Sequence, residues 1–96
     1  MTIKFHSEVR KEFFDAAEYY EEQVVGLGDN FIDEVEKVLD VIGQQPTSGT
    51  KITKIERRFL VSRFPNGIIY SVEEDRITIF AVMNLRRKPE YWKSRT

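Results

Sequence analysis

Cysteine is absent from this 96-residue chain, and histidine occurs only once, at His6. Without cysteine the protein forms no disulfide and has no thiolate nucleophile, and one histidine cannot supply the usual zinc ligands. A lone histidine with no supporting sequence context also gives no reason to expect a Ser-His-Asp triad. We interpret His6 as a structural or surface residue, and we expect no metal site.

A phosphate-binding glycine loop is also missing. Gly26-Leu27-Gly28 follows a helical pattern instead of a strand and lacks the remaining spacing of such a loop, so we expect no nucleotide or other cofactor. No apolar run approaches the ~20 residues that span a bilayer, and the first residues lack the apolar core of a signal peptide. The expected location is the cytoplasm, away from membranes.

What the chain does contain is the composition of a folded domain. Hydrophobic residues make up 41%, aromatic residues 12% and charged residues 32%. A chain of about 100 residues has room for one hydrophobic core. We therefore expect a single domain over residues 1–96.

The formal net charge of −1 conceals two halves of opposite sign. Residues 1–45 carry four Lys and Arg against eleven Asp and Glu. Residues 46–96 carry eleven Lys and Arg against five Asp and Glu. A basic half of this kind is typical of proteins that bind a polyanion or an acidic protein partner. The acids of the first half are interpreted as a solvated helix face.

Hydrophobic spacing predicts two helices near the start of the chain. Residues 2–6 alternate as in a short strand, and Ser7 is a plausible cap for a helix that runs to about residue 24. A second helix, capped by Asp29 or Asn30, should end by Gln45, because Pro46 disfavours helical geometry in the residue before it. A loop this short makes the two helices an antiparallel hairpin.

Beyond a loop at residues 46–50 the period changes to that of strands. Residues 57–64, 68–73 and 76–83 are rich in β-formers and are separated by Pro65-Asn66-Gly67 and Glu74-Asp75, both turn signals. They predict a three-stranded antiparallel meander, and Pro89 predicts a short helix over residues 90–95. The fold class is α+β, in the order β-αα-βββ-(α), with the hairpin on one face of the sheet and the other face open to water.

Basic residues gather on the predicted meander and the C-terminal tail. Metal-free RNA cleavage needs cations for the phosphorane charge and groups that exchange protons. Arg58, Arg63, Arg86 and Arg87 could stabilise that charge and Tyr91 could give a proton, while the base is less evident, with Glu56 and Tyr70 as candidates. Trp92 is better explained as a residue that packs the tail onto the sheet.

The pattern YY…LG..F in the helical half, followed by RFP..I.Y.V..D.I.I.AV….R.P.YW..R, resembles the RelE/ParE superfamily of toxins from type II toxin–antitoxin systems, the plasmid stabilisation type. The resemblance covers nearly the whole chain. It implies the small α+β toxin fold and a cognate antitoxin that wraps the toxin and blocks its working surface.

The resemblance leaves the target open. RelE-like members cleave mRNA on the ribosome, and their site residues correspond by position to Arg58, Arg63, Arg86 or Arg87, and Tyr91. ParE-like members inhibit DNA gyrase without a hydrolytic site, and a degenerate, non-toxic member is a third alternative. Relatives commonly carry His at the position of Asn84 and Tyr at that of Asn66, and asparagine cannot exchange a proton near neutral pH. Asn84 in place of histidine therefore weakens the nuclease hypothesis.

Overall fold

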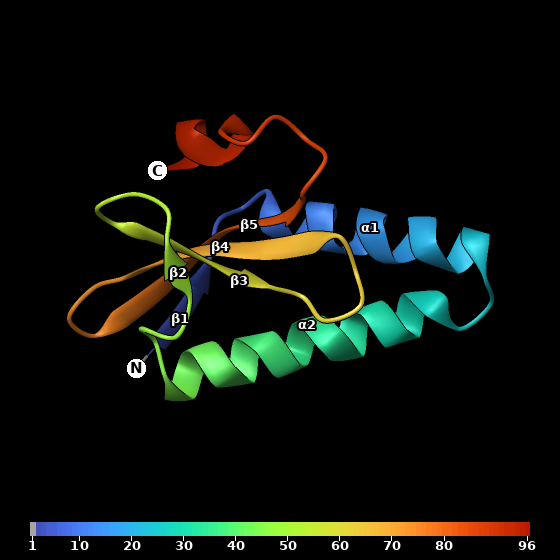
Figure 1. The fold of residues 1–96 in the computed structure, drawn as a ribbon, viewed down its shortest axis with the longest axis horizontal. Helices are drawn as coiled ribbons and strands as arrows, with labels where there is room; N and C mark the ends of the chain where they lie inside the picture. The colour runs from blue at the N-terminus through green and yellow to red at the C-terminus, as the bar shows by residue number, and fades with distance from the viewer. Residues whose placement is uncertain (1) are drawn as a thin grey trace.

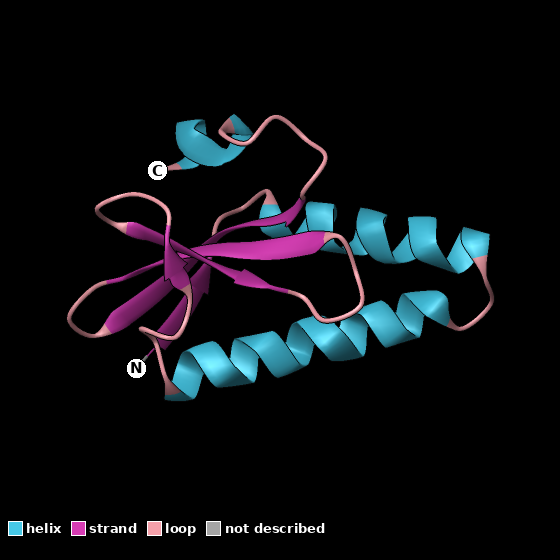
Figure 2. Cartoon of the chain, viewed as in Figure 1, coloured by secondary structure: helices cyan, strands magenta, loops and turns pink. Residues whose placement is uncertain are grey.

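The computed structural model describes residues 2–96, which form a five-stranded sheet with a helical hairpin on one face (Figures 1 and 2). The elements are β1 (Thr2–Phe5), α1 (Val9–Gln23), α2 (Leu27–Gln44), β2 (Thr50–Lys51), β3 (Glu56–Leu60), β4 (Asn66–Val72), β5 (Arg76–Asn84) and the 3₁₀ helix η1 (Tyr91–Arg95). The α+β class and the predicted order of elements are confirmed. Neither α-helix of the described part is long and apolar enough to cross a bilayer.

The sheet has the strand order β1-β5-β4-β3-β2. The predicted antiparallel meander corresponds to β3, β4 and β5, and the two-residue strand β2 extends it at one edge. β1 lies at the other edge and runs parallel to β5, with Thr2 opposite Arg76 and Phe5 opposite Ile79. The sheet of the described residues is therefore mixed, with one parallel pair and three antiparallel pairs. The helical hairpin connects β1 to the meander.

The ends of the helices differ from the prediction in ways that backbone geometry explains. Ser7 makes no capping hydrogen bond, and the His6 ring nitrogen Nδ1 instead accepts the N–H of Glu8 at 3.1 Å. α2 starts two residues before the predicted cap at Asp29. The residue that precedes it, Gly26, has a φ of 89°, a left-handed conformation that glycine adopts without steric cost.

Each face of the sheet packs against a different part of the chain. Ile68, Tyr70, Ile77 and Ile79 face the helices and form the main core with residues such as Phe31, Val35 and Ile42. On the opposite face Trp92, which is 2% exposed, packs with Ile69, Ala81 and Met83. The predicted packing role of Trp92 is confirmed. The prediction that the second face is open to water was therefore wrong in part, because the tail covers some of it.

The turn between β3 and β4 occupies residues 61–65 and so comes earlier than the predicted turn at Pro65-Asn66-Gly67. β3 ends at Leu60, and β4 already begins at Asn66, whose side chain is buried. The buried amide oxygen Oδ1 of Asn66 accepts a hydrogen bond from the Tyr20 hydroxyl at 2.6 Å. A buried polar group needs such a partner, so this contact explains how asparagine is accommodated inside the strand.

Candidate functional site

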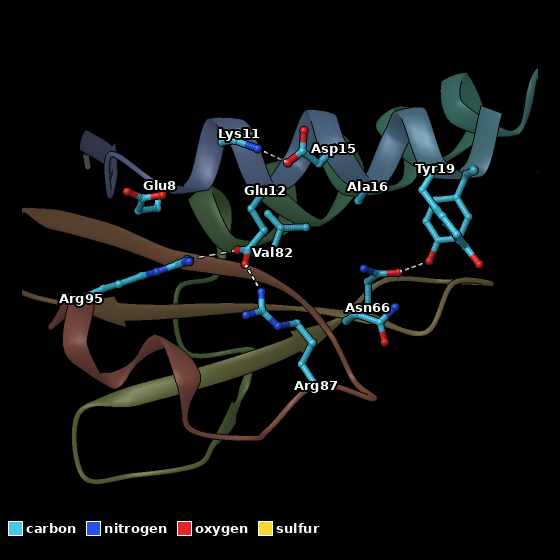
Figure 3. Close-up of a pocket in the computed structure, with 12 residues that line it drawn as sticks. Glu8, Lys11, Glu12, Asp15, Ala16, Tyr19, Asn66, Val82, Arg87 and Arg95 are labelled. Atoms are coloured by element: carbon cyan, nitrogen blue, oxygen red, sulfur yellow. Dashed lines mark hydrogen bonds and ion pairs between the residues drawn. The ribbon is translucent and has the colours of Figure 1, made fainter. Parts of the chain in front are cut away.

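The carboxylate of Glu12 on α1 joins three segments of the chain (Figure 3). Its Oε1 accepts the backbone N–H of Val82 at 2.8 Å and Nη1 of Arg95 at 3.2 Å. Its Oε2 accepts the Tyr91 hydroxyl at 2.5 Å and lies 3.5 Å from Nη1 of Arg87. A carboxylate offers about four lone-pair sites, and these donors fill them. We call Glu12, Arg87, Tyr91 and Arg95 the Glu12 cluster.

Glu12 packs against a part of β5 that has an open edge and an extra residue. β1 pairs with β5 only as far as Ile79, so the same edge of β5 has no neighbouring strand beyond it. Phe80 is an extra residue in β5, because Ile69 pairs with Ala81 while Tyr70 pairs with Ile79. Side chains satisfy this open edge: Arg95 donates to the Phe80 carbonyl at 2.9 Å, and Glu12 accepts from Val82.

Two arginine side chains of the Glu12 cluster make cation–π contacts with the Tyr91 ring. The Arg87 guanidinium carbon lies 3.7 Å from the centre of the Tyr91 ring, and that of Arg95 lies 5.2 Å from it. Burial raises the pKa of the Tyr91 hydroxyl well above its ordinary value, and the hydrogen bond to Glu12 raises it further. Tyr91 therefore stays protonated and donates to Glu12.

A cleft of about 490 Å³ lies beside the cluster, between α1 and the ends of β4 and β5 (Figure 3). Its walls carry acids and bases in similar number, and one pair, Lys11 and Asp15, is joined at 2.5 Å. Asn66 and Asn84 also line it. Within residues 2–96, no three histidine or carboxylate side chains lie together in a way that could hold a metal ion.

The five residues proposed from the sequence do not form one group. Arg87 and Tyr91 lie together in the Glu12 cluster. Arg58 faces the other side of the tail, in a hollow of about 160 Å³ that Trp92 and Lys93 also line. Arg63 lies in the β3–β4 turn, 3.9 Å from the buried carboxylate of Glu34 on α2.

Arg86 follows β5, and its backbone N–H donates to Oδ1 of Asn84 at 2.8 Å. The amide of Asn84 thus shapes the start of the tail. The Arg86 side chain is exposed, and among the described residues it forms no ion pair. Arg86 is therefore free to meet a partner.

Sequence reasoning missed Glu12, which it placed among the solvated acids. The side chains of Glu12 and Arg95 are only 13% and 14% exposed. One signal was present: Glu12, Ala16 and Tyr20 follow one another at intervals of four, so Glu12 lies at the border of the apolar face of the helix. A carboxylate at that border must find donors if other segments cover it.

The cluster can clamp the tail onto α1, but it presents no free base. Every lone-pair site of Glu12 has a donor, and the Tyr91 proton already has an acceptor. Together, the mixed sheet, the helical hairpin and the clamped basic tail define a small α+β protein of the RelE/ParE toxin type.

Comparisons with known proteins agree with this class. Residues 3–89 match the family described as the ParE toxin of the type II toxin–antitoxin system parDE, and the chain belongs to this family. Among solved structures it is similar to the chromosomal ParDE system from P. aeruginosa, with a TM-score of 0.70 and 13% identity, over 88% of this chain and 94% of the other. No curated protein sequence matches. Membership of a type II system implies a cognate antitoxin as partner.

Proposed function

We propose that this chain is a cytoplasmic toxin that arrests growth by binding a protein target, without breaking a bond itself. The Glu12 cluster carries this proposal. Its carboxylate holds Tyr91 and Arg87, the two tail residues that a nuclease would use for proton transfer and charge stabilisation. A metal-free nuclease needs these groups directed at its substrate.

DNA gyrase is the target to test first, because the sequence resembles ParE-type toxins. The antitoxin would neutralise the toxin by binding to it and keeping it from its target. Induction of the toxin alone should then arrest growth, leave transcripts intact and impair supercoiling, while induction together with the antitoxin should restore growth. Purified toxin should inhibit supercoiling by purified gyrase.

The variant Tyr91→Phe separates this mechanism from catalysis. It removes one hydroxyl and keeps the ring beneath Arg87, so a toxin that acts by binding should retain nearly all its activity. Normal supercoiling by gyrase in excess toxin would argue against gyrase as the target. Cleaved transcripts that disappear with Tyr91→Phe would refute the binding mechanism altogether.

Ribosome-associated mRNA cleavage is the second candidate, because two proposed cations remain available. In the part of the chain described here, Arg58 and Arg86 form no ion pair, and Arg58 shares a hollow with Lys93 and Trp92. In this mechanism Arg58, Arg63, Arg86 and Arg87 would grip phosphates and Tyr91 would transfer a proton. Both Arg87→Ala and Tyr91→Phe should then abolish cleavage and toxicity.

A further inference from the structure

The turn that joins α1 to α2 exposes two adjacent valines. Val24 is 59% exposed and Val25 is 92% exposed. Neither valine belongs to either hydrophobic core. Single exposed apolar residues are ordinary on protein surfaces, but neighbouring ones at one end of a molecule are typical of interaction sites. We call Val24 and Val25 the hairpin tip.

The backbone of the turn is held in place. The Glu21 carboxylate accepts the N–H of Gly26 at 2.9 Å through Oε2 and that of Gly28 at 3.0 Å through Oε1. A Cβ on Gly28 would come within 2.6 Å of the Ala17 carbonyl, so the two helices approach as closely as glycine permits. A pre-ordered turn loses little conformational entropy when it binds. The valines are therefore presented in a fixed position.

The helical segments that flank the hairpin tip carry charge of mainly one sign. Residues 12–36 contain nine Asp and Glu and no Lys or Arg. Glu18 and Glu22 in the last two turns of α1 and Asp29 in the first turn of α2 are exposed, and none forms an ion pair within residues 2–96. An apolar centre inside an acidic border complements a partner surface with an apolar pocket bordered by Lys and Arg.

The α1–α2 turn and the 3₁₀ helix η1 of the basic tail lie toward opposite ends of the molecule (Figure 1). Figure 1 shows the α1–α2 turn at one end of the molecule, on the right, and the β2–β3 and β4–β5 loops at the opposite end. The longest dimension of the molecule is 40 Å. The basic residues of the sheet and tail suit an acidic partner, so a basic partner would meet the toxin at the other end.

We propose that the hairpin tip is the surface that docks onto the protein target of the toxin, with Val25 seated in an apolar pocket of the target that is bordered by basic residues. This inference rests on the proposed function, since it names the part of the toxin that meets the target. It assigns the antitoxin to a different surface. The toxin therefore carries two interaction surfaces of opposite charge.

Val25→Lys tests the apolar contact, and Ile55→Lys is its matched control. Ile55 is also an exposed aliphatic residue, at 66%, and lies in the loop between β2 and β3. Val25→Lys should raise the amount of toxin needed for growth arrest at least about tenfold, because a lysine would lose the pocket and meet like charge. Ile55→Lys should match the wild type. Both variants should keep the wild-type melting temperature and antitoxin affinity.

Glu22→Lys tests the charge, with Glu74→Lys in the β4–β5 turn as a control of the same charge change. Only Glu22→Lys should weaken growth arrest.

Wild-type potency of Val25→Lys, or an equal loss in Ile55→Lys, would overturn the docking inference while the proposed function stands. If Val25→Lys lost antitoxin affinity but arrested growth normally, the hairpin tip would be an antitoxin site, and the docking inference would be overturned as well. Cleaved transcripts in the wild-type culture would overturn the proposed function and this inference with it.

Discussion

The hydroxyl of Tyr91 donates a hydrogen bond of 2.5 Å to the carboxylate of Glu12, 79 residues earlier in the chain. The contact fastens the C-terminal tail to the first helix. Trp92, the next residue, is buried on the sheet face that points away from the helices. The tail is thus held at two adjacent residues by different forces, a charged hydrogen-bonded cluster and an apolar contact.

Removal of the Glu12 carboxylate should destabilise the protein. Glu12→Ala would leave two cations and a hydroxyl without their acceptor near the largely buried Arg95, and we expect a loss of about 2–3 kcal/mol in the free energy of unfolding. Denaturant unfolding measures it. Glu8→Ala removes an exposed acid that lines the same cleft, and it should cost less than about 0.5 kcal/mol. Equal losses in the two variants would contradict the role given to Glu12.

The raised pKa of Tyr91 predicts a loss of stability in alkali. A tyrosine in the unfolded chain ionises near pH 10, whereas burial and Glu12 keep Tyr91 neutral in the fold to higher pH. Its contribution is therefore complete below about pH 10 and declines as the pH rises above that value. Chemical unfolding between pH 8 and pH 11 should show a steeper decline for wild type than for Tyr91→Phe, by up to about 1 kcal/mol. Parallel pH profiles of the free energy of unfolding for the two proteins would contradict the raised pKa of Tyr91.

Arg63 has a φ of 68°, the left-handed region that disfavours residues other than glycine. Its ion pair with Glu34 is long, at 3.9 Å, and the arginine side chain is 66% exposed, so it contributes little. Arg63→Gly should therefore stabilise the protein by about 0.5–1 kcal/mol, seen as a higher melting temperature. Arg63→Ala keeps the strain and should not. A stabilised Arg63→Gly variant that loses toxicity would indicate a functional role for the arginine.

Antitoxin binding should weaken as salt concentration rises. The tail carries the exposed cations Arg86, Lys88 and Lys93, and an acidic or amphipathic segment of the antitoxin would lie over them. Titration calorimetry at increasing ionic strength measures the effect, and Lys88→Gln should reduce the slope. Affinity that does not change with salt, or a slope that responds only to substitutions on the helices, would contradict this placement.

Local patterns in the sequence were enough to predict most of the elements. Apolar residues at helical spacing gave α1 and α2 to within a few residues, since each amphipathic face must be buried. Alternating β-formers gave β3, β4 and β5, although β4 begins earlier than predicted because Asn66 finds the Tyr20 hydroxyl as a buried partner. A turn signal cannot reveal a partner 46 residues away.

The sequence by itself determined the fold class, the two helices and meander, and the separation of acidic and basic halves, because these follow from residues close together in the chain. Only the tertiary structure decided that β1 runs parallel to β5 and leaves the edge of β5 open beyond Ile79. That open edge, together with the path of the tail, brings Val82, Arg87, Tyr91 and Arg95 to Glu12. A carboxylate that looks solvated in the sequence is therefore the centre of the site, since its donors lie 70 to 83 residues away.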